Sequence, residues 1–467
     1  MTKDKIFTKV NMIFNANLYI LHKYTKERLP SFMLQVIISN GQTGKKMKDI
    51  VVQKFGGTSV ADTDKIKNVA QAIIREKNNG HDIVVVVSAM GHTTDYLVKM
   101  AHEISPNPSS REMDMLLSTG EGVSIALLAM ALQAQGCPAV SMNAMQIGIM
   151  TEKVHSKARI IDIKTEKIKS YLEQGKVVVV AGFQGITEDL EITTLGRGGS
   201  DTSAVALAGA LNAIRCDIYT DVEGVYTTDP RIVPNASRLE QISYGEMLEL
   251  ARVGANVLHP RAVETAKQYE VPVRVRSTFK LDNLGTLILG VEKMELHKPV
   301  TGVASDLSQL RIVVCDVKDN PGTAAILFNG LAIANISVDM IIQSYARREL
   351  NTNDIAFTID KNDLKQTLNI LEKVKAQLEF SNVFVDDKIA KISIVGAGMI
   401  DRPGIAAKMF KTLADNNINI KMISTSEIKI SCIVDENDAK KSVESLHEAF
   451  HLESDEIAEV KGTLPDV

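Results

Sequence analysis

The chain contains 467 residues, of which 45% are hydrophobic, and its formal net charge is −4. This length predicts several domains with ample cores, and the near-neutral charge excludes the basic surface typical of nucleic-acid-binding proteins and gives no sign of a membrane partner. The four cysteines form no Cys-x-x-Cys pair, which predicts free thiols in a reducing cytoplasm; they are Cys137, Cys216, Cys315 and Cys432.

Residues 1–46 differ from the rest of the chain. Their most apolar stretch, residues 12–21, contains Asn15 and Asn17 and is too short to span a bilayer, and no signal-peptide cleavage pattern follows it. Met47 stands just before the first predicted strand. We therefore expect residues 1–46 to be a disordered extension or an untranslated segment, and Met47 to be the true start.

A glycine turn with a lysine follows the first predicted strand. Residues 54–59 read Lys-Phe-Gly-Gly-Thr-Ser, and apolar residues at helical spacing begin after Asp62 or Thr63, either of which could cap the helix. The order of strand, glycine turn and helix is typical of a phosphate site at the carboxyl end of a parallel strand. The spacing of a Walker loop is absent. Lys54 instead precedes the glycines, from where it would reach back over a phosphate as a point charge.

A second glycine turn lies at residues 196–201, which read Gly-Arg-Gly-Gly-Ser-Asp, and the apolar helical run 202–211 follows at once. Such a loop turns backbone N–H groups toward one point, the helix dipole favours an anion there, and an arginine adds a fork of donors for a carboxylate or phosphate. The simpler interpretation is a glycine turn with Ser200 or Asp201 as helix N-cap. Two such loops in one domain favour the anion site.

The region 47–295 is predicted to be one α/β domain. Residues 83–87 (Ile-Val-Val-Val-Val) and 177–181 (Val-Val-Val-Val-Ala) are unbroken apolar runs, typical of parallel strands buried on both faces. Helical patterns at residues 116–135 and 203–214 alternate with them. His259, which precedes Pro260, is interpreted as structural because no other metal ligands surround it.

The C-terminal region contains an internal repeat. Asp-Asn-Pro-Gly at 319–322 recurs as Asp-Arg-Pro-Gly at 401–404, and the segment 335–340 recurs at 417–422 with the same offset. This predicts two small β-α-β-β-α-β modules, residues 300–384 and 385–467, which could share a strand from about residues 300–308. Proline is placed where each first helix begins. Gly396-Ala397-Gly398 resembles a dinucleotide fingerprint, but Asp401 occupies the third glycine position, so a nicotinamide site is rejected.

Five motifs together resemble aspartate kinases, members of the amino-acid kinase superfamily that carry paired ACT domains. The resemblance extends from about residue 48 to the C-terminus and implies a three-layer αβα kinase domain with a mainly parallel sheet, followed by two ferredoxin-like α+β ACT modules. The motifs are residues 54–59, Ser-Thr-Gly-Glu at 118–121, 196–201, Thr-Asp-Val-Glu-Gly-Val-Tyr-Thr-Thr-Asp-Pro-Arg at 220–231, and Gly-Ala-Asn-Val-Leu-His-Pro at 254–260.

The resemblance implies transfer of the γ-phosphoryl group of ATP, with Mg²⁺, to the β-carboxylate of L-aspartate. It assigns catalytic roles to Lys54, Arg197 and Asp201, with Asp201 assisting Mg²⁺ or orienting Lys54. The residues implied in binding aspartate are Thr94, Glu121, Phe183, Arg197 and Ser200. Those implied in binding ATP are Lys54, Phe55, Gly56, Gly57, Ser59, Thr220, Asp221, Tyr226, Arg231 and Asn256.

Structural alternatives stand beside several of these roles. Ser118 and Glu121 fit a capping box, Asp201 fits an N-cap, and Tyr226 and Arg231 fit a turn. Asn256 occupies a position where the family often has lysine. A glutamate, acetylglutamate, carbamate or UMP kinase would share the fold and the lysine-glycine loop, and a non-enzymatic amino-acid sensor would share the tandem modules.

The paired modules imply feedback inhibition by an amino acid and assembly as a homodimer or a dimer of dimers. Asp339 of the first module corresponds to Lys421 of the second, and an acidic group favours L-lysine as the effector, with threonine as the alternative. Asp339 could also be a solvated charge. The residues expected near the effector are Asp319, Ser337, Val338, Asp339 and Ser344.

Overall fold

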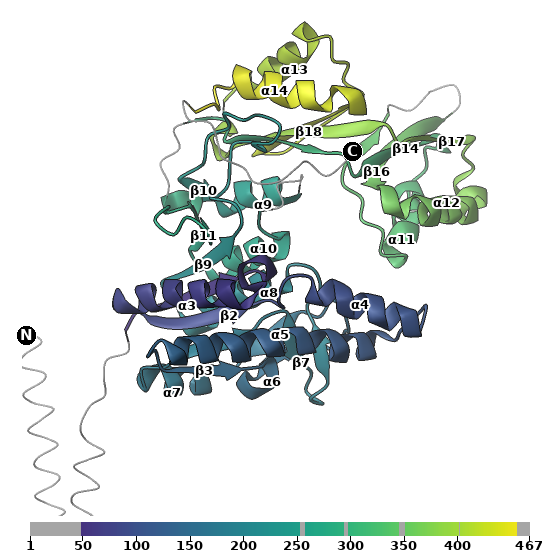
Figure 1. The fold of residues 1–467 in the computed structure, drawn as a ribbon. Coiled ribbons are helices and arrows are strands. Elements are labelled where there is room, and N and C mark those ends of the chain that lie inside the picture. The colour runs from purple at the N-terminus through teal and green to yellow at the C-terminus, as the bar shows by residue number, and fades with distance from the viewer. Residues whose placement is uncertain (1–47, 253–256, 294–297, 345–350, 401, 455–467) are drawn as a thin grey trace, which may run out of the picture. The chain divides into compact units, whose positions relative to one another are not determined.

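The computed structural model describes residues 48–252, 257–293, 298–344, 351–400 and 402–454, all within one compact unit, Lys48–Val467 (Figure 1). The expectations for residues 1–46 and for Asn256 lie outside the described residues. An eight-stranded sheet, a small four-stranded sheet and two further four-stranded sheets make up the fold.

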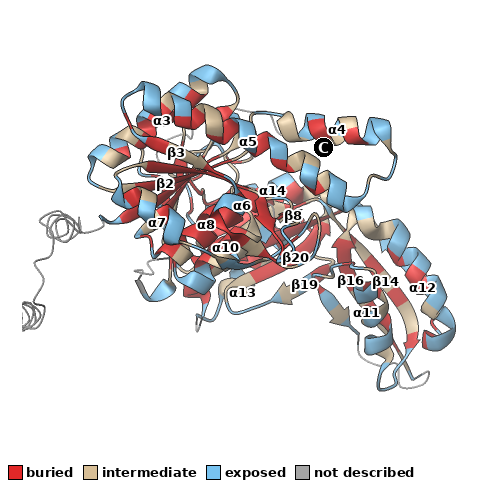
Figure 2. Cartoon of the chain, turned by 90° about the horizontal axis from the view of Figure 1, so that it is seen from below, coloured by how far each residue is buried: buried red, intermediate tan, exposed pale blue. Residues whose placement is uncertain are grey.

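The eight-stranded sheet has the order β10-β12-β11-β9-β1-β2-β6-β3, and all its pairs are parallel except β11 with β12. Its strands are β1 (Ile50–Phe55), β2 (Asp82–Val87), β3 (Ala139–Met142), β6 (Val177–Ala181), β9 (Arg215–Thr220), β10 (Gln241–Ser243), β11 (Val273–Ser277) and β12 (Thr286–Leu289). β2 and β6 are almost entirely buried, and each has a neighbouring strand on both sides, which agrees with their apolar runs; Figure 2 shows β2 in the buried interior.

Helices cover both faces of this sheet, which confirms the three-layer α/β fold. One apolar core joins α3 (Thr63–Asn78) and α5 (Ser110–Ala134) to the sheet, and the other joins α7 (Glu166–Glu173), α8 (Gly199–Leu211) and α10 (Pro260–Tyr269) to its opposite face. The remaining helices of this region are α4 (Thr93–Ile104), α6 (Ala144–Ile147) and α9 (Tyr244–Arg252), with a 3₁₀ turn at Gly57–Val60.

Helix boundaries are set by their caps. Asp62 caps α3, since its carboxylate accepts a hydrogen bond from the Lys65 N–H, and His259 caps α10, as its structural interpretation implied. The helix expected at 116–135 begins earlier because Ser109 caps it, and the helix expected at 203–214 begins at Gly199. α5 is long and apolar enough by composition to span a membrane, but its inward side packs in the core, and core helices meet the same criterion.

A small sheet beside the main one has the order β5-β4-β7-β8. Its strands are β4 (Ile149–Thr151), β5 (Ile160–Ile163), β7 (Gln184–Ile186) and β8 (Ile192–Thr194). Residues 195–198 connect β8 directly to α8. The second glycine turn therefore lies between this sheet and a core helix.

Two α+β modules follow, each with an antiparallel sheet. The first contains β14 (Gln309–Lys318), β15 (Ile341–Gln343), β16 (Thr352–Asp360) and β17 (Asn382–Asp386), with helices α11 (Thr323–Ile333) and α12 (Leu364–Leu378). The second contains β18 (Ile389–Val395), β19 (Met422–Thr425) and β20 (Lys429–Asp435), with α13 (Ile405–Asp415) and α14 (Ala439–Ala449). Its remaining strand is β13 (Gly302–Asp306), which pairs with β18 although it precedes the whole first sheet in the chain.

The repeated proline does not begin the helices, contrary to the expectation. In each module the helix starts two residues after the proline, and the N-cap is a glycine, Gly322 or Gly404, with a φ of 99° or 100°. A glycine is favoured there because other residues rarely adopt this left-handed conformation. Proline and glycine thus form the turn that precedes the helix and sets its direction.

Candidate active site

A hollow of about 310 Å³ lies at the carboxyl ends of the central strands, and both glycine turns border it. In an α/β sheet this edge is where ligands bind. The lining residues are Lys54, Gly57, Ser88, Ala89, Gly91, Thr94, Glu121, Phe183, Gly196, Arg197, Gly198, Gly199, Ser200 and Asp201. The residues expected from the sequence to bind aspartate all belong to this set.

Lys54 and Asp201 form an ion pair inside the hollow. Lys54 lies near the end of β1 and Asp201 in the first turn of α8, and their Nζ and Oδ1 atoms are 2.6 Å apart. The N-cap of α8 is Gly198, with a φ of 69°, so the interpretation of Ser200 or Asp201 as a cap is wrong. Asp201 instead holds the Lys54 ammonium in the wall of the hollow.

The glycines permit close backbone packing around the hollow. A Cβ on Gly57 would lie 2.8 Å from the carbonyl oxygen of Ala89, and one on Gly198 would lie 2.3 Å from His259. Gly196 and Gly198 also have left-handed φ values of 77° and 69°. A side chain at these positions would move the turns away from the space that a ligand would occupy.

Arg197 is exposed at the rim of the hollow, and its guanidinium has no hydrogen-bond or ion-pair partner within the described part of the chain. Ser200 of the same motif is buried and packs against Gly182. A Cβ added to Gly182 would lie 2.8 Å from the Ser200 Oγ. The turn is therefore tightly packed, while its Arg197 guanidinium remains available to a ligand. A guanidinium binds carboxylates through two parallel hydrogen bonds.

Glu121 is a buried carboxyl group with spare bonding capacity. Its side chain is 2% exposed, Oε1 accepts a hydrogen bond of 3.2 Å from the Ala89 N–H, and Oε2 has no partner among the described residues. Burial raises its pKa to about 7. Because Glu121 lies in the middle of α5, whose cap is Ser109, the capping-box interpretation is wrong. An unpartnered buried oxygen facing a hollow is typical of a ligand contact.

Thr94 and Phe183 complete the wall near Glu121. Thr94 lies in the first turn of α4, and Phe183 follows β6 with a φ of 69°. The Phe183 N–H donates to the Ser203 hydroxyl at 3.1 Å, which fixes this unusual backbone. Sequence reasoning missed Ser88, Ala89 and Gly91, although they follow a strand that neighbours β1.

Only some of the residues expected to bind ATP lie at the hollow or at the same edge of the sheet. Phe55 is fully buried and stacks on Tyr219, so its side chain belongs to the core, and Ser59 bonds to Thr278 at 2.7 Å. Thr220 is the last residue of β9 and Asp221 follows it; because β9 is parallel and adjacent to β1, both lie at the edge that carries Lys54. Tyr226 and Arg231 do not line the hollow. Tyr226 forms a bridge with Arg238, and Arg231 pairs with Asp229 at 2.6 Å.

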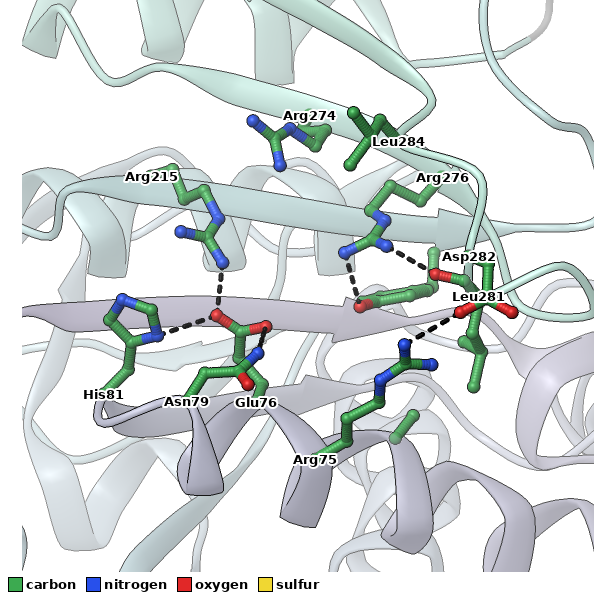
Figure 3. Close-up of a pocket in the computed structure, with 12 residues that line it drawn as sticks. Arg75, Glu76, Asn79, His81, Arg215, Arg274, Arg276, Leu281, Asp282 and Leu284 are labelled. Carbon is green, nitrogen blue, oxygen red and sulfur yellow. Dashed lines mark hydrogen bonds and ion pairs between the residues drawn. The ribbon is translucent and has the colours of Figure 1, made fainter.

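A second hollow, of about 320 Å³, is lined by several arginines, most of which bind other residues of its lining (Figure 3). Arg215 binds Glu76 and Asp217, and Arg276 donates to the Leu281 carbonyl oxygen at 2.7 Å. Arg75 pairs with Asp282 at 2.8 Å. These bonds connect α3 to β9, β11 and the loop after β11, which is a structural role.

The residues expected at the effector site lie in the first module. Asp339 is exposed, with its side chain 40% accessible, and it forms an ion pair of 2.5 Å with Lys391, whose side chain is 4% exposed. It is therefore a partly solvated charge with a buried partner. Asp319 accepts from Asn353 at 3.1 Å, and Ser344 accepts from the Asp354 N–H at 2.8 Å. Ser337 is exposed, and Val338 packs against the core of its module.

The Amino acid kinase family model matches residues 49–277, and the ACT domain model matches residues 311–374 and 392–450. The fold and the site thus define an amino-acid kinase with tandem ACT modules.

Aspartokinase 2 of Bacillus subtilis (strain 168) is 55% identical over 403 residues, which cover 86% of this chain and 98% of that protein. The aspartokinase of Geobacillus stearothermophilus is 53% identical over 412 residues, or 88% and 99% of the two chains. The structure of E. coli aspartokinase III in complex with aspartate and ADP (R-state) superposes with a TM-score of 0.74 at 28% identity, over 86% of this chain and 100% of that one. The chain belongs to the aspartokinase family, whose members phosphorylate aspartate, and the resemblance drawn from its motifs is confirmed.

Proposed function

We propose that this chain transfers the γ-phosphoryl group of ATP to the β-carboxylate of L-aspartate in the cytoplasm. The observation that carries the assignment of the site is the placement of two cationic groups and one acidic group around one hollow: the Lys54 ammonium, the free Arg197 guanidinium and the Glu121 carboxyl group, whose Oε2 has no partner among the described residues. An amino acid with two carboxylates and one ammonium has the complementary charges. An ATP-dependent hydroxamate assay with aspartate tests the activity.

The chemistry needs charge placement more than a base. The β-carboxylate of aspartate has an ordinary pKa near ~3.9 and is already ionised at neutral pH, so the obstacle is bringing one anion onto another. Lys54 neutralises charge on the transferred phosphoryl group, while Arg197 binds the α-carboxylate and Glu121 the α-ammonium. Thr94, Phe183 and Ser200 shape the space for the substrate. The rate enhancement then comes from positioning and electrostatic stabilisation.

ATP binding is assigned to the strand ends beside this hollow. We place the phosphates against the 54–59 turn, with Gly56, Gly57 and the backbone of Phe55, and the nucleoside against residues 220–231. Mg²⁺ usually binds phosphate oxygens together with one or two carboxylates, so we assign it to the ATP phosphates, with Asp201, the partner of Lys54, as the carboxylate that would assist it. Bound Mg²⁺ would neutralise phosphate charge. Asp201 also orients Lys54.

Arg197→Lys tests whether the bidentate geometry of the guanidinium matters in addition to its positive charge. Lysine retains the cation but loses the bidentate geometry, so we expect the KM for aspartate to rise about tenfold or more while the KM for ATP stays nearly constant. Steady-state kinetics with each substrate varied in turn measures both values. Arg159→Lys, which changes an exposed arginine on the same domain, is the control. Equal damage to both substrates would contradict the role given to Arg197.

We further propose feedback inhibition by L-lysine through the first ACT module, with threonine as the alternative effector, and assembly as a homodimer or a dimer of dimers. The E. coli relative in complex with lysine and aspartate (T-state) supports the choice of lysine. Glu246 of α9 accepts hydrogen bonds from Thr301 at 2.6 Å and from the Ala397 N–H at 2.8 Å, so the second module contacts the kinase domain, and the ion pair of Asp339 with Lys391 joins the first module to the second.

Asp339→Asn tests the effector assignment. If the lysine ammonium binds Asp339 by displacing Lys391, the variant loses about tenfold or more in lysine sensitivity, because a charged hydrogen bond contributes ~1.5–3 kcal/mol. Its uninhibited kcat stays near that of the wild type. Inhibition curves with lysine and threonine measure the change, with Asp415→Asn in the second module as the control. Unchanged lysine sensitivity would place the effector elsewhere.

A further inference from the structure

Asp114 is a fully buried carboxylate on α5 that lies outside the lining of the hollow. Its Oδ1 accepts a hydrogen bond of 2.6 Å from the Thr194 hydroxyl, and its Oδ2 lies 2.8 Å from the His155 ring Nδ1. Both oxygens lie within 3.1 Å of the Ser156 N–H. One side chain therefore joins α5 to the segment between β4 and β5 and to the last residue of β8.

These two segments directly support the Arg197 turn. Thr194 is three residues before Arg197, and the Ala158 N–H donates to its carbonyl oxygen at 3.0 Å. Ser156 has a φ of 69°, and its carbonyl oxygen would lie 2.9 Å from a Cβ placed on Gly196. A non-glycine residue in this conformation is strained by about 1 kcal/mol or more and needs a fixed partner. Asp114 supplies that partner immediately behind the turn.

The same helix also carries Glu121. Seven residues separate Asp114 from Glu121, which is two helical turns, so both side chains lie on one face of α5 at a spacing of about 10 Å. Both are buried, at 0% and 2% exposure. α5 thus holds the proposed ammonium-binding group directly and the proposed carboxylate-binding turn through Asp114.

We propose that Asp114 is a positioning residue that sets the distance between Arg197 and Glu121, and with it the fit of the α-amino-acid group of the substrate. This inference rests on the proposed roles of those two residues. The α-ammonium and α-carboxylate are attached to one carbon, so both contacts form only if the turn and α5 keep their spacing. A displacement of about 1 Å at a reacting site can cost ~100-fold in rate.

The turn has a second brace, which keeps the test interpretable. Arg261 of α10 donates to the carbonyl oxygens of Leu195 and Ala158, the latter at 2.9 Å. The turn should therefore shift, and not unfold, when Asp114 is changed. The hydrogen bonds of Asp114 described above go to His155, Ser156 and Thr194 and not to the 54–59 turn, so we expect ATP binding to change little.

The experiment compares Asp114→Asn and Thr194→Val with a matched control. An asparagine presents an NH₂ group where an acceptor is needed, and valine keeps the shape of threonine but removes its hydroxyl. We expect the aspartate KM to rise about tenfold or more for Asp114→Asn and about threefold or more for Thr194→Val, with the ATP KM within about twofold of the wild type. Ser124→Ala, a buried change on the same helix, should leave both values unchanged.

A double-mutant cycle distinguishes positioning from general destabilisation. If Asp114 acts through Arg197, Asp114→Asn should add less than about twofold to the aspartate KM of Arg197→Lys. If Asp114→Asn does not fold, Thr194→Val takes its place in the cycle. An unchanged aspartate KM in both variants, or additive effects with Arg197→Lys, would overturn the inference while Arg197→Lys alone still reports on the proposed substrate site.

Discussion

Glu121→Gln is expected to raise the KM for aspartate by about two orders of magnitude and to leave the KM for ATP almost unchanged. Glutamine can still accept from the Ala89 N–H, so the backbone contact of 3.2 Å survives. What is lost is the negative charge opposite the substrate ammonium, and a charged hydrogen bond in a buried site contributes about 1.5–3 kcal/mol or more. Isothermal titration of aspartate, together with initial rates, measures the loss.

The pH dependence should identify Glu121 independently. Because burial raises its pKa to about 7, the carboxyl group is largely protonated and cannot bind an ammonium at pH 6. We therefore expect kcat/KM for aspartate to rise about tenfold per pH unit below 7 and to level off above it, since this ratio reports groups of the free enzyme. In Glu121→Gln this rise should disappear. A profile that is unchanged by the substitution would assign the titration to another group.

The same pKa shift predicts a stability change of the opposite sign. A folded-state pKa of about 7 exceeds the ordinary carboxyl value, so the wild type is destabilised as pH rises from about 4.5 to 7, by up to ~3 kcal/mol above pH 7. Glu121→Gln removes this penalty. The unliganded variant should melt at a higher temperature than the wild type at pH 8 and at a similar temperature at pH 4.5. Glu112→Gln, an exposed change on the same helix, is the control.

Lys54→Met should produce the largest loss of turnover, with kcat falling by about 10²–10³-fold, which is typical when a group that stabilises transition-state charge is removed. The loss has a second component, because Asp201 would then face the phosphates without its partner at 2.6 Å. Asp201→Asn keeps the lysine but releases it from its position, so we expect a smaller fall in kcat. Single-turnover rates at saturating substrates separate these effects from binding.

The double variant Lys54→Met with Asp201→Asn tests the coupling between the two residues. It should recover part of the activity lost in Lys54→Met, because the repulsive carboxylate is gone. Lys65→Met, which removes a lysine of α3 that lies 3.9 Å from Asp62, is the matched control. A Lys54→Met enzyme with wild-type kcat would exclude this lysine from the chemistry.

The layered α/β fold and the two glycine turns could be predicted from the sequence, because each depends on local signals. Strands without polar alternation indicate a buried parallel sheet, as β2 and β6 show. The Lys54 turn ends β1 of the main sheet and the Arg197 turn follows β8 of the small sheet, and the two come together through the ion pair of Lys54 with Asp201. The Glu121 assignment depended on the family, since Ser118 and Glu121 fit a helix cap equally well until the full length of α5 is seen.

Features that depend on long-range packing were missed. No local pattern reveals that Asp114 reaches Thr194 across 80 residues. The strand that the modules were expected to share, near residues 300–308, is β13, which pairs with β18 of the second module. The charge of Asp339 was visible in the sequence, but its partner Lys391 comes from the other module and could be found only in three dimensions. Side-chain type can be read from a sequence, whereas the pairing of side chains is decided by the fold.

The central claim is that Lys54 and Arg197 bring two anionic reactants together at one hollow. Its most direct test is acyl phosphate formation, trapped with hydroxylamine as the hydroxamate, in the wild type, Lys54→Met, Arg197→Lys and the double variant, with aspartate and with glutamate. The account predicts ATP-dependent hydroxamate from aspartate and little from glutamate, a loss with Lys54→Met that excess aspartate does not restore, and a loss with Arg197→Lys that excess aspartate does restore. Wild-type hydroxamate formation by the double variant would contradict it.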